Sequence, residues 1–381
     1  MITRQKLVTY GIPTVATATI VAAALLTSGP RRSLLTPTNG TIPSHVVSGK
    51  HQIDVVFAVD TTGSMGGLLD GAKRTVWSIA SHIRKTDPDA DLRIGLVAYR
   101  DIGDDYVTKP LSLTSDLDAV YAELATYQAA GGGDTPEDVD AALDDSLHKM
   151  QWRDGAKKLI FVVGDAPPAS RGEVPTFDVS AREAAERGIM INTIRCGFDN
   201  DTASTFKRIS SLGNGVFSTI QQNGGVQQVA TPYDDKLAAL SSEIDHTSII
   251  MGDEGVRGRY EAKMASAEAA APASKADRAS YYAKGKSGGM KRGDDDLVGG
   301  YAEGTVALDS VDKKSLPSDM QGKDATEIKA EVEKRVAQRQ KLQKEIQELT
   351  KQRDEFLAKQ TKDGEGGFDS AVKATVEMQI K

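Results

Sequence analysis

The chain has 381 residues and a formal net charge of −7, from 54 acidic and 47 basic side chains. Nucleic acid is therefore not expected as the main partner, because binding to phosphates requires a basic surface. The single cysteine, Cys196, excludes an intrachain disulfide, and the five histidines lack the spacing of a zinc site. Any bound metal should therefore have oxygen ligands.

An apolar segment near the N-terminus indicates a membrane signal. Arg4 and Lys6 precede the apolar run 7–26, which at about 1.5 Å per helical residue is just long enough to cross a bilayer. We interpret residues 1–32 as a signal anchor, because no small-residue cleavage pattern follows the run. A cleaved signal peptide and an organellar transit peptide are the alternatives. The remainder, tethered by residues 33–50, should lie outside the cytoplasmic membrane, in the periplasm or at the cell surface. Cleavage would make it a secreted protein.

Residues 51–252 alternate between strand and helix patterns. Continuous apolar runs predict strands, whereas apolar positions three and four apart predict helices. The expected strands are 52–60, 92–99, 107–113, 158–165, 189–195 and 216–220, with 107–113 at an edge. The expected helices are 66–85, 117–127, 136–150, 179–187, 203–212 and 232–250. This alternation predicts an α/β fold with a doubly wound, mostly parallel sheet, helices on both faces, and ligands at the carboxyl ends of the strands.

Three of the predicted loops at strand ends carry oxygen ligands. The first strand runs into Asp60-Thr61-Thr62-Gly63-Ser64-Met65, which can direct one carboxylate and two hydroxyls to a single point. The glycine-rich loop 131–138 (GGGDTPED) offers Thr135 or Asp134, and the strand ending at Gly164 is followed by Asp165. Each motif alone is typical of a turn, a helix N-cap or a strand end. Their combination in this order favours a site for a hard divalent cation.

In this combination the sequence resembles the von Willebrand factor type A domain with a metal-ion-dependent adhesion site, over roughly residues 50–250. The resemblance implies that Thr62, Ser64 and Thr135 ligate the ion through hydroxyls, and that Asp60 and Asp165 act largely through bound water. Thr62 stands where the family commonly has serine. The extra Asp134 makes the ligand from the glycine-rich loop the least certain one. The rim of the implied partner-binding surface consists of Met65, Gly66, Asp101 and Pro167.

The resemblance also implies how such a site binds. One coordination position stays open for an acidic side chain of a partner protein, with Mg²⁺ as the expected ion and Mn²⁺ or Ca²⁺ as alternatives. We expect no enzyme, because Ser64 lacks a nucleophile elbow and no histidine is placed by sequence to activate it. An envelope scaffold acting through a C-terminal coiled coil and a metal-assisted hydrolase remain the alternative functions.

The C-terminal third divides into two predicted regions. Residues 253–323 are rich in Ala, Gly, Ser, Lys and Asp, which predicts a flexible, low-complexity linker. Within the tail 324–381, apolar residues spaced three and four apart over 326–360 predict a long helix with arginines along the same seam. This helix could form a coiled coil in a homo-oligomer, dock on a partner or on the body of the protein, or stay single. Leu316-Pro317, followed by Gln321-Gly322-Lys323 and a Glu-rich helix, weakly resembles the tail of bacterial exported proteins with this domain. A short amphipathic segment ends the chain.

Overall fold

The computed structural model describes residues 51–133, 135–169, 172–226, 228–284, 291–360 and 366–381. The predicted signal anchor and tether lie outside these residues. In the described ranges, none of the helices combines the length and apolar character needed to cross a membrane.

A six-stranded sheet forms the centre of the fold, in the order β3-β2-β1-β4-β5-β6. All neighbouring strands are parallel except β3, an edge strand antiparallel to β2. The strands are β1 (His51–Asp60), β2 (Ala90–Tyr99), β3 (Thr108–Thr114), β4 (Lys157–Gly164), β5 (Ile189–Cys196) and β6 (Phe217–Ile220). The strands predicted from apolar runs are thus confirmed to within two residues at each end, including the edge position of β3.

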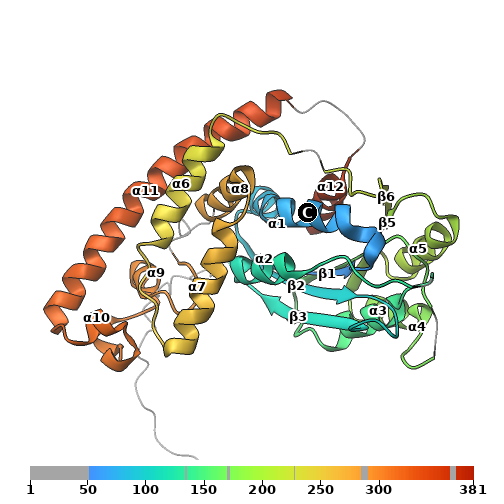
Figure 1. Ribbon diagram of the computed structural model, residues 1–381, viewed down its shortest axis with the longest axis horizontal. Helices are drawn as coiled ribbons and strands as arrows, with labels where there is room; N and C mark the ends of the chain where they lie inside the picture. Colours follow the sequence, from blue (N-terminus) through green and yellow to red (C-terminus); the bar gives the residue numbers. More distant parts are fainter. Residues whose placement is uncertain (1–50, 134, 170–171, 227, 285–290, 361–365) are drawn as a thin grey trace, which may run out of the picture. The chain divides into compact units, whose positions relative to one another are not determined.

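Helices cover both faces of this sheet (Figure 1). One face packs against α1 (Gly66–Thr86), α2 (Leu117–Thr126) and α12 (Phe368–Ile380). The other packs against α3 (Val139–His148), α4 (Phe177–Glu186) and α5 (Asn200–Leu212). Successive residues of β1 alternate between the two cores, since Val55 and Phe57 belong to the first and Val56 and Ala58 to the second. A strand buried on both faces explains the continuous apolar run in its sequence.

The region 253–323 is not the flexible linker that its composition predicts. It forms four helices, α7 (Glu254–Glu268), α8 (Pro272–Ala283), α9 (Leu297–Ala302) and α10 (Ser318–Gln321), in its described residues. The helix α6 (Asp234–Asp245) precedes them. Two 3₁₀ turns, Leu308–Ser310 and Lys313–Ser315, lie between α9 and α10. Alanines of α8 pack against α6, and the buried Arg278 of α8 pairs with Asp118 and Asp245 at 2.7 Å. Small side chains and buried ion pairs therefore replace the large apolar residues whose scarcity suggested disorder.

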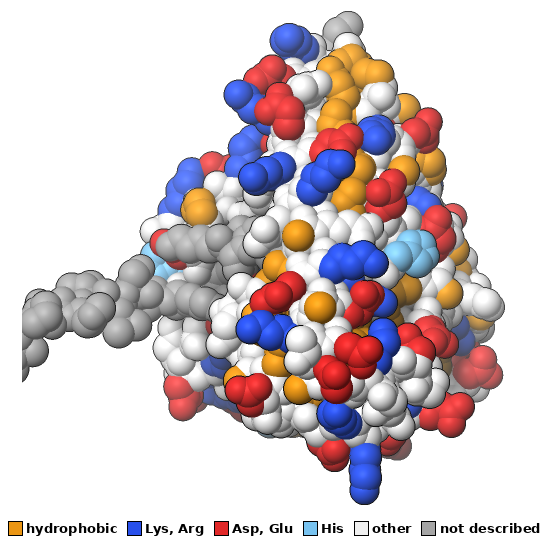
Figure 2. Space-filling model, turned by 90° about the vertical axis from the view of Figure 1, so that its left-hand side faces the viewer, with side chains coloured by type: hydrophobic (Ala, Val, Ile, Leu, Met, Phe, Trp, Pro, Cys, Tyr) orange, Lys and Arg blue, Asp and Glu red, His pale blue; other side chains and the backbone are white. Residues whose placement is uncertain are grey.

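The long C-terminal helix α11 (Ala325–Gln360) confirms the predicted helix 326–360. Its apolar seam contacts α6, α8 and α9 of the same chain, which is one of the three arrangements that the sequence left open. Two arginines of the seam are buried in ion pairs, Arg339 with Asp296 at 2.5 Å and Arg353 with Asp234 at 2.7 Å. Figure 2, viewed from the side where Figure 1 places α11, shows Lys, Arg, Asp and Glu side chains interspersed over the surface.

The last helix, α12, belongs to the same hydrophobic core as β1. Phe368, Val372, Val376 and Ile380 are buried in it, and the ring centroids of Phe368 and Phe57 lie 6.1 Å apart. The predicted division into a domain over 51–252 and a separate tail over 324–381 therefore differs from the structure, in which the described residues belong to one compact unit. Sequence periodicity predicted the amphipathic helix but not the surface on which it packs.

Candidate functional site

Two carboxylates meet at the carboxyl edge of the sheet. Asp60 is the last residue of β1, and Asp165 directly follows the neighbouring parallel strand β4. The two carboxylates are close enough that, in addition to burial, the charge of Asp165 helps to raise the pKa of Asp60. The structure thus brings together the ends of two predicted strands, as expected for parallel neighbours.

The loop after β1 folds back onto Asp60. Thr62 donates two hydrogen bonds to Asp60 Oδ1, from its backbone nitrogen at 2.8 Å and from Oγ1 at 2.6 Å. The Ser64 hydroxyl lies 3.4 Å from the Thr62 hydroxyl. Thr61 turns the other way and contacts Tyr106 and the Tyr99 carbonyl. The residues at positions 60, 62 and 64 therefore share one side of the loop, as their spacing predicted.

The glycine-rich loop lies against this first loop. The Gly131 carbonyl accepts a hydrogen bond from the Gly63 backbone at 3.3 Å. Gly132 has a φ of 76°, and a Cβ there would lie 3.0 Å from Thr62 Cβ and 3.3 Å from Glu137 Oε1, so the close approach requires glycine. Thr135 is exposed in the short segment between Gly132 and Glu137, while Asp134 lies outside the described residues.

Glu137 is a site residue that the sequence analysis missed. It is 4% exposed and is held between the loops by backbone hydrogen bonds to Pro167 and Ala169. Burial, followed by the charges of Asp60, Asp101, Asp104 and Asp165, raises its pKa to about 8. The motif GGGDTPED contained the signal, since an acidic pair follows the proline, but only the fold shows that Glu137 turns inward while Asp138 caps α3.

Asp60 has the environment of a cation ligand. Its side chain is fully buried, and Oδ2 has no hydrogen-bond partner among the described residues. Burial raises the pKa of Asp60 to about 7, with a further contribution from the charge of Asp165 and opposed by the hydrogen bonds from Thr62. A buried carboxylate oxygen without a donor is unfavourable unless a proton or a cation compensates it.

The candidate cation ligands of this site are hydroxyl oxygens as well as carboxylate oxygens. Within the described ranges, no group of three or more His, Cys, Asp or Glu side chains is placed to hold a metal. Asp60, Asp165 and the hydroxyls of Thr62 and Ser64 nevertheless fit a hard cation such as Mg²⁺, which takes few protein ligands and keeps several waters. The chemistry of these residues is therefore compatible with the ion that the sequence suggested.

A second residue that the sequence analysis missed is Gln222, in the loop after β6. Its side-chain amide donates to Asp165 Oδ2 at 2.5 Å and to the Ser64 carbonyl at 3.4 Å. Gln222 thus joins the loops after β1 and β4 to the loop after β6. No local pattern marks this residue, because its role arises only when three distant segments meet.

The predicted partner-binding rim is partly wrong. Met65 is fully buried in the core, and Asp101 is only 2% exposed, so neither side chain is available at the surface. Met65 ends the 3₁₀ turn Gly63–Met65, which rotates its side chain inward beneath α1. Gly66 and Pro167 are partly exposed and remain candidates for contact with a partner.

Comparison with known proteins identifies the domain. The family model of the von Willebrand factor type A domain matches residues 54–231. The von Willebrand factor A domain-containing protein 7 of Rattus norvegicus is 36% identical over 113 residues, which cover 29% of this chain and 12% of that protein. The alpha-protein kinase vwkA of Dictyostelium discoideum is 27% identical over 119 residues, covering 30% of this chain and 18% of the kinase. The chain thus spans less than a fifth of the length of these relatives.

A solved structure, the conserved hypothetical protein BatB from Bacteroides thetaiotaomicron, is similar over 44% of this chain and 90% of its own, at 17% identity and a TM-score of 0.35. The family match covers the sheet and the three loops of the candidate site but ends before α6. Residues 54–231 of this chain therefore form a von Willebrand factor type A domain.

Proposed function

We propose that this chain is a divalent-cation-dependent protein-binding module, in which the cation occupies a metal-ion-dependent adhesion site and a partner supplies an acidic side chain. The observation that carries the proposal is the fully buried Asp60, whose Oδ2 has no partner among the described residues and whose other oxygen binds Thr62. Von Willebrand factor type A domains generally mediate protein interactions, which supports a binding role for the site.

The residues that would hold the ion are Thr62, Ser64 and Thr135 through hydroxyls, with Asp60 and Asp165 as the acidic members. A bound Mg²⁺ supplies an electrophilic centre that an incoming carboxylate can ligate. Asp60 fixes the Thr62 hydroxyl by accepting its hydrogen bond, and Gln222 fixes Asp165 by donating a hydrogen bond to its Oδ2. These contacts hold the oxygens in place before binding, which reduces the ordering cost of an added ligand.

A binding role is proposed in preference to catalysis. Of the four histidines in the described part of the chain, His51 contacts Asp87, His82 contacts Glu377 of α12, and His148 contacts Asp144 and Glu183. His246 lies at the end of α6. Among the described residues, none of these rings is hydrogen-bonded to Ser64, the one hydroxyl of the site that is exposed in the loop after β1. A nucleophilic serine requires an adjacent base, and the site is accordingly proposed as a docking site rather than a reaction centre.

We further propose that the apolar run 7–26 anchors the module in the cytoplasmic membrane with the domain on the outer side. The support is the sequence of this segment and the two basic residues before it. Proteolytic removal of the run would release the same domain as a secreted protein.

Calorimetric titration of the chain with Mg²⁺ tests the proposal. The wild type should bind one equivalent, and Asp60→Asn, which keeps the shape of the side chain but removes its charge, should lose this binding. Asp70→Asn is the matched control, since Asp70 is an exposed acid on α1. Equal binding by all three proteins would refute the assigned site, and absence of binding by the folded wild type would refute cation dependence.

A further inference from the structure

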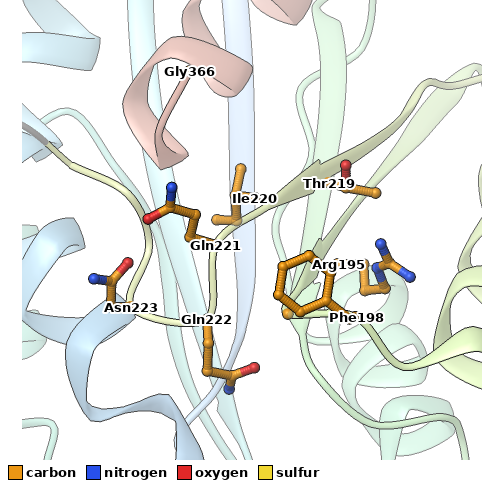
Figure 3. Close-up of a pocket in the computed structure, with 9 residues that line it drawn as sticks. Arg195, Phe198, Thr219, Ile220, Gln221, Gln222, Asn223 and Gly366 are labelled. Carbon is orange, nitrogen blue, oxygen red and sulfur yellow. The ribbon is translucent and has the colours of Figure 1, made fainter. Parts of the chain in front are cut away.

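A cleft of about 650 Å³ opens at the same edge of the sheet as the cation site, and no function assigned above uses it. It lies between the loop after β5 and the loop after β6 (Figure 3). Phe198 and Arg195 lie on one side of it, and Gln221, Gln222 and Asn223 lie on the other.

Phe198 gives the cleft an aromatic wall. Its side chain is 85% exposed, more than any other large hydrophobic residue in the described part of the chain. It follows Gly197, whose φ of 72° turns the chain sharply after β5. An aromatic ring held in solvent leaves a large apolar surface uncovered, and a partner's side chain could bury this surface.

Arg195 makes the cleft cationic, in contrast to the acidic site beside it. It carries the only charge among the described residues that line the cleft. Its Nη1 donates to the Asp199 carbonyl at 3.0 Å, whereas its Nε has no hydrogen-bond partner among the described residues. A guanidinium beside an exposed phenyl ring favours an aromatic guest, which can stack on the ring and contact the cation through its π face.

Gln222 makes the cleft continuous with the cation site. It lines the cleft, and its amide donates to both Asp165 Oδ2 and the Ser64 carbonyl. A Cβ at Gly197 would lie 2.2 Å from Gln222 Oε1, so the two loops that bound the cleft approach each other closely at this residue. One partner segment can therefore reach both the cation site and the cleft, because only the Gln222 side chain lies between them.

We propose that the cleft binds an aromatic side chain of the same partner segment whose carboxylate reaches the cation, and that Phe198 and Arg195 select for it. This inference rests on the proposed function, since it assigns the neighbouring half of the same interface. The partner recognised is then a peptide segment with an acidic residue and a tryptophan or tyrosine close to it in sequence.

Capped peptides with one aspartate test the proposal on the full chain loaded with Mn²⁺. Each peptide carries tryptophan, alanine or a second aspartate as its variable residue. This residue follows the first aspartate directly or after one or two glycines, because the distance between the cation site and the cleft decides which spacing binds most tightly. Stacking on Phe198 together with the contact to Arg195 predicts about tenfold tighter binding of the best tryptophan peptide than of its alanine counterpart. Competition against a fluorescent copy of that peptide measures the ratio.

Phe198→Ala should reduce the preference for tryptophan to the part that Arg195 supplies, about threefold, and leave the affinity for the alanine peptide and for Mn²⁺ unchanged. Val179→Ala, at an exposed valine of α4, is the matched control and should keep the preference. Equal binding of tryptophan and alanine peptides by the wild type overturns the cleft proposal and leaves the proposed function standing. Tighter binding of the second-aspartate peptide overturns it in favour of an acidic guest at Arg195. Failure to bind Mn²⁺, or to bind any peptide once Mn²⁺ is bound, refutes the proposed function itself.

Discussion

The C-terminal helix α12 should contribute several kcal/mol to the stability of the von Willebrand factor type A domain, and Phe368→Ala tests this. Phe368 is 3% exposed and packs against Phe57 of β1 with a centroid separation of 6.1 Å. Replacement of a buried phenylalanine by alanine costs about 3–5 kcal/mol, because contacts are lost and a cavity remains. Since a domain is stable by only about 5–15 kcal/mol, the variant should lose a large part of its stability.

Urea unfolding followed by tryptophan fluorescence measures the change. Trp77 of α1 is buried in the same hydrophobic cluster as Phe368 and stacks on Tyr121 with a centroid separation of 4.0 Å, so its emission reports on this core. With a slope of about 3 kcal/mol per M urea, the expected loss lowers the unfolding midpoint by about 1 M or more.

Met378→Ala is the matched control, because Met378 lies on the same helix but is 62% exposed. Its free energy of unfolding should change by no more than about 0.5 kcal/mol. If Phe368→Ala unfolds at the same urea concentration as Met378→Ala, α12 is not packed in the core in solution and the reasoning is refuted.

Two further predictions concern buried charge. Without divalent cations, stability should fall as the pH rises from about 4 through 8, because the pKa values of Asp60 and Glu137 are raised to about 7 and 8 and the folded state holds these protons more tightly than the unfolded chain. Mg²⁺ should therefore raise the Tm more at pH 8 than at pH 5, and an equal rise at both values would contradict this. Arg278→Ala should lower the free energy of unfolding by about 3–5 kcal/mol, since it leaves the buried Asp118 carboxylate without its ion-pair partner. It also removes one of the two arginines that pair with Asp245. Urea unfolding checks this value, and a loss below about 1 kcal/mol would show that the network is hydrated.

The sheet could be predicted from the sequence because its strands are buried on both faces. The runs ending at Asp60 and Gly164 are continuously apolar, and this pattern fixed both the strands and their carboxyl ends. Once these ends were located, the positions of Asp60, Thr62, Ser64 and Asp165 followed from the topology of a parallel sheet. The predicted ligands therefore lie in loops that meet, although the ion itself stays a proposal.

The residues that sequence reasoning missed depend on contacts between distant segments. Gln222 reaches Asp165 from the loop after β6, and Glu137 turns inward only because its backbone pairs with Pro167 and Ala169. The sequence analysis placed Met65 at the surface. A short 3₁₀ turn, which has no clear sequence signal, rotates its side chain into the core instead.

The helical region after residue 252 was misjudged for a compositional reason. Low content of large apolar residues predicts disorder when burial of apolar surface is the main source of stability. Here, alanines allow α8 to pack closely, and arginines such as Arg353 are buried with carboxylates of two other segments. Amphipathic spacing marked the segment that forms α12, but the core on which its apolar face packs is set by tertiary packing.

A crystal structure of the chain grown with Mn²⁺ tests the central claim most directly, because anomalous scattering locates the ion independently of the protein model. The account predicts one strong anomalous peak within coordination distance of the Thr62 and Ser64 hydroxyls, beside Asp60 and Asp165, with one ligand supplied by solvent or by a carboxylate of a neighbouring molecule. A fully occupied ion elsewhere, or none at this edge of the sheet at millimolar Mn²⁺, would contradict it.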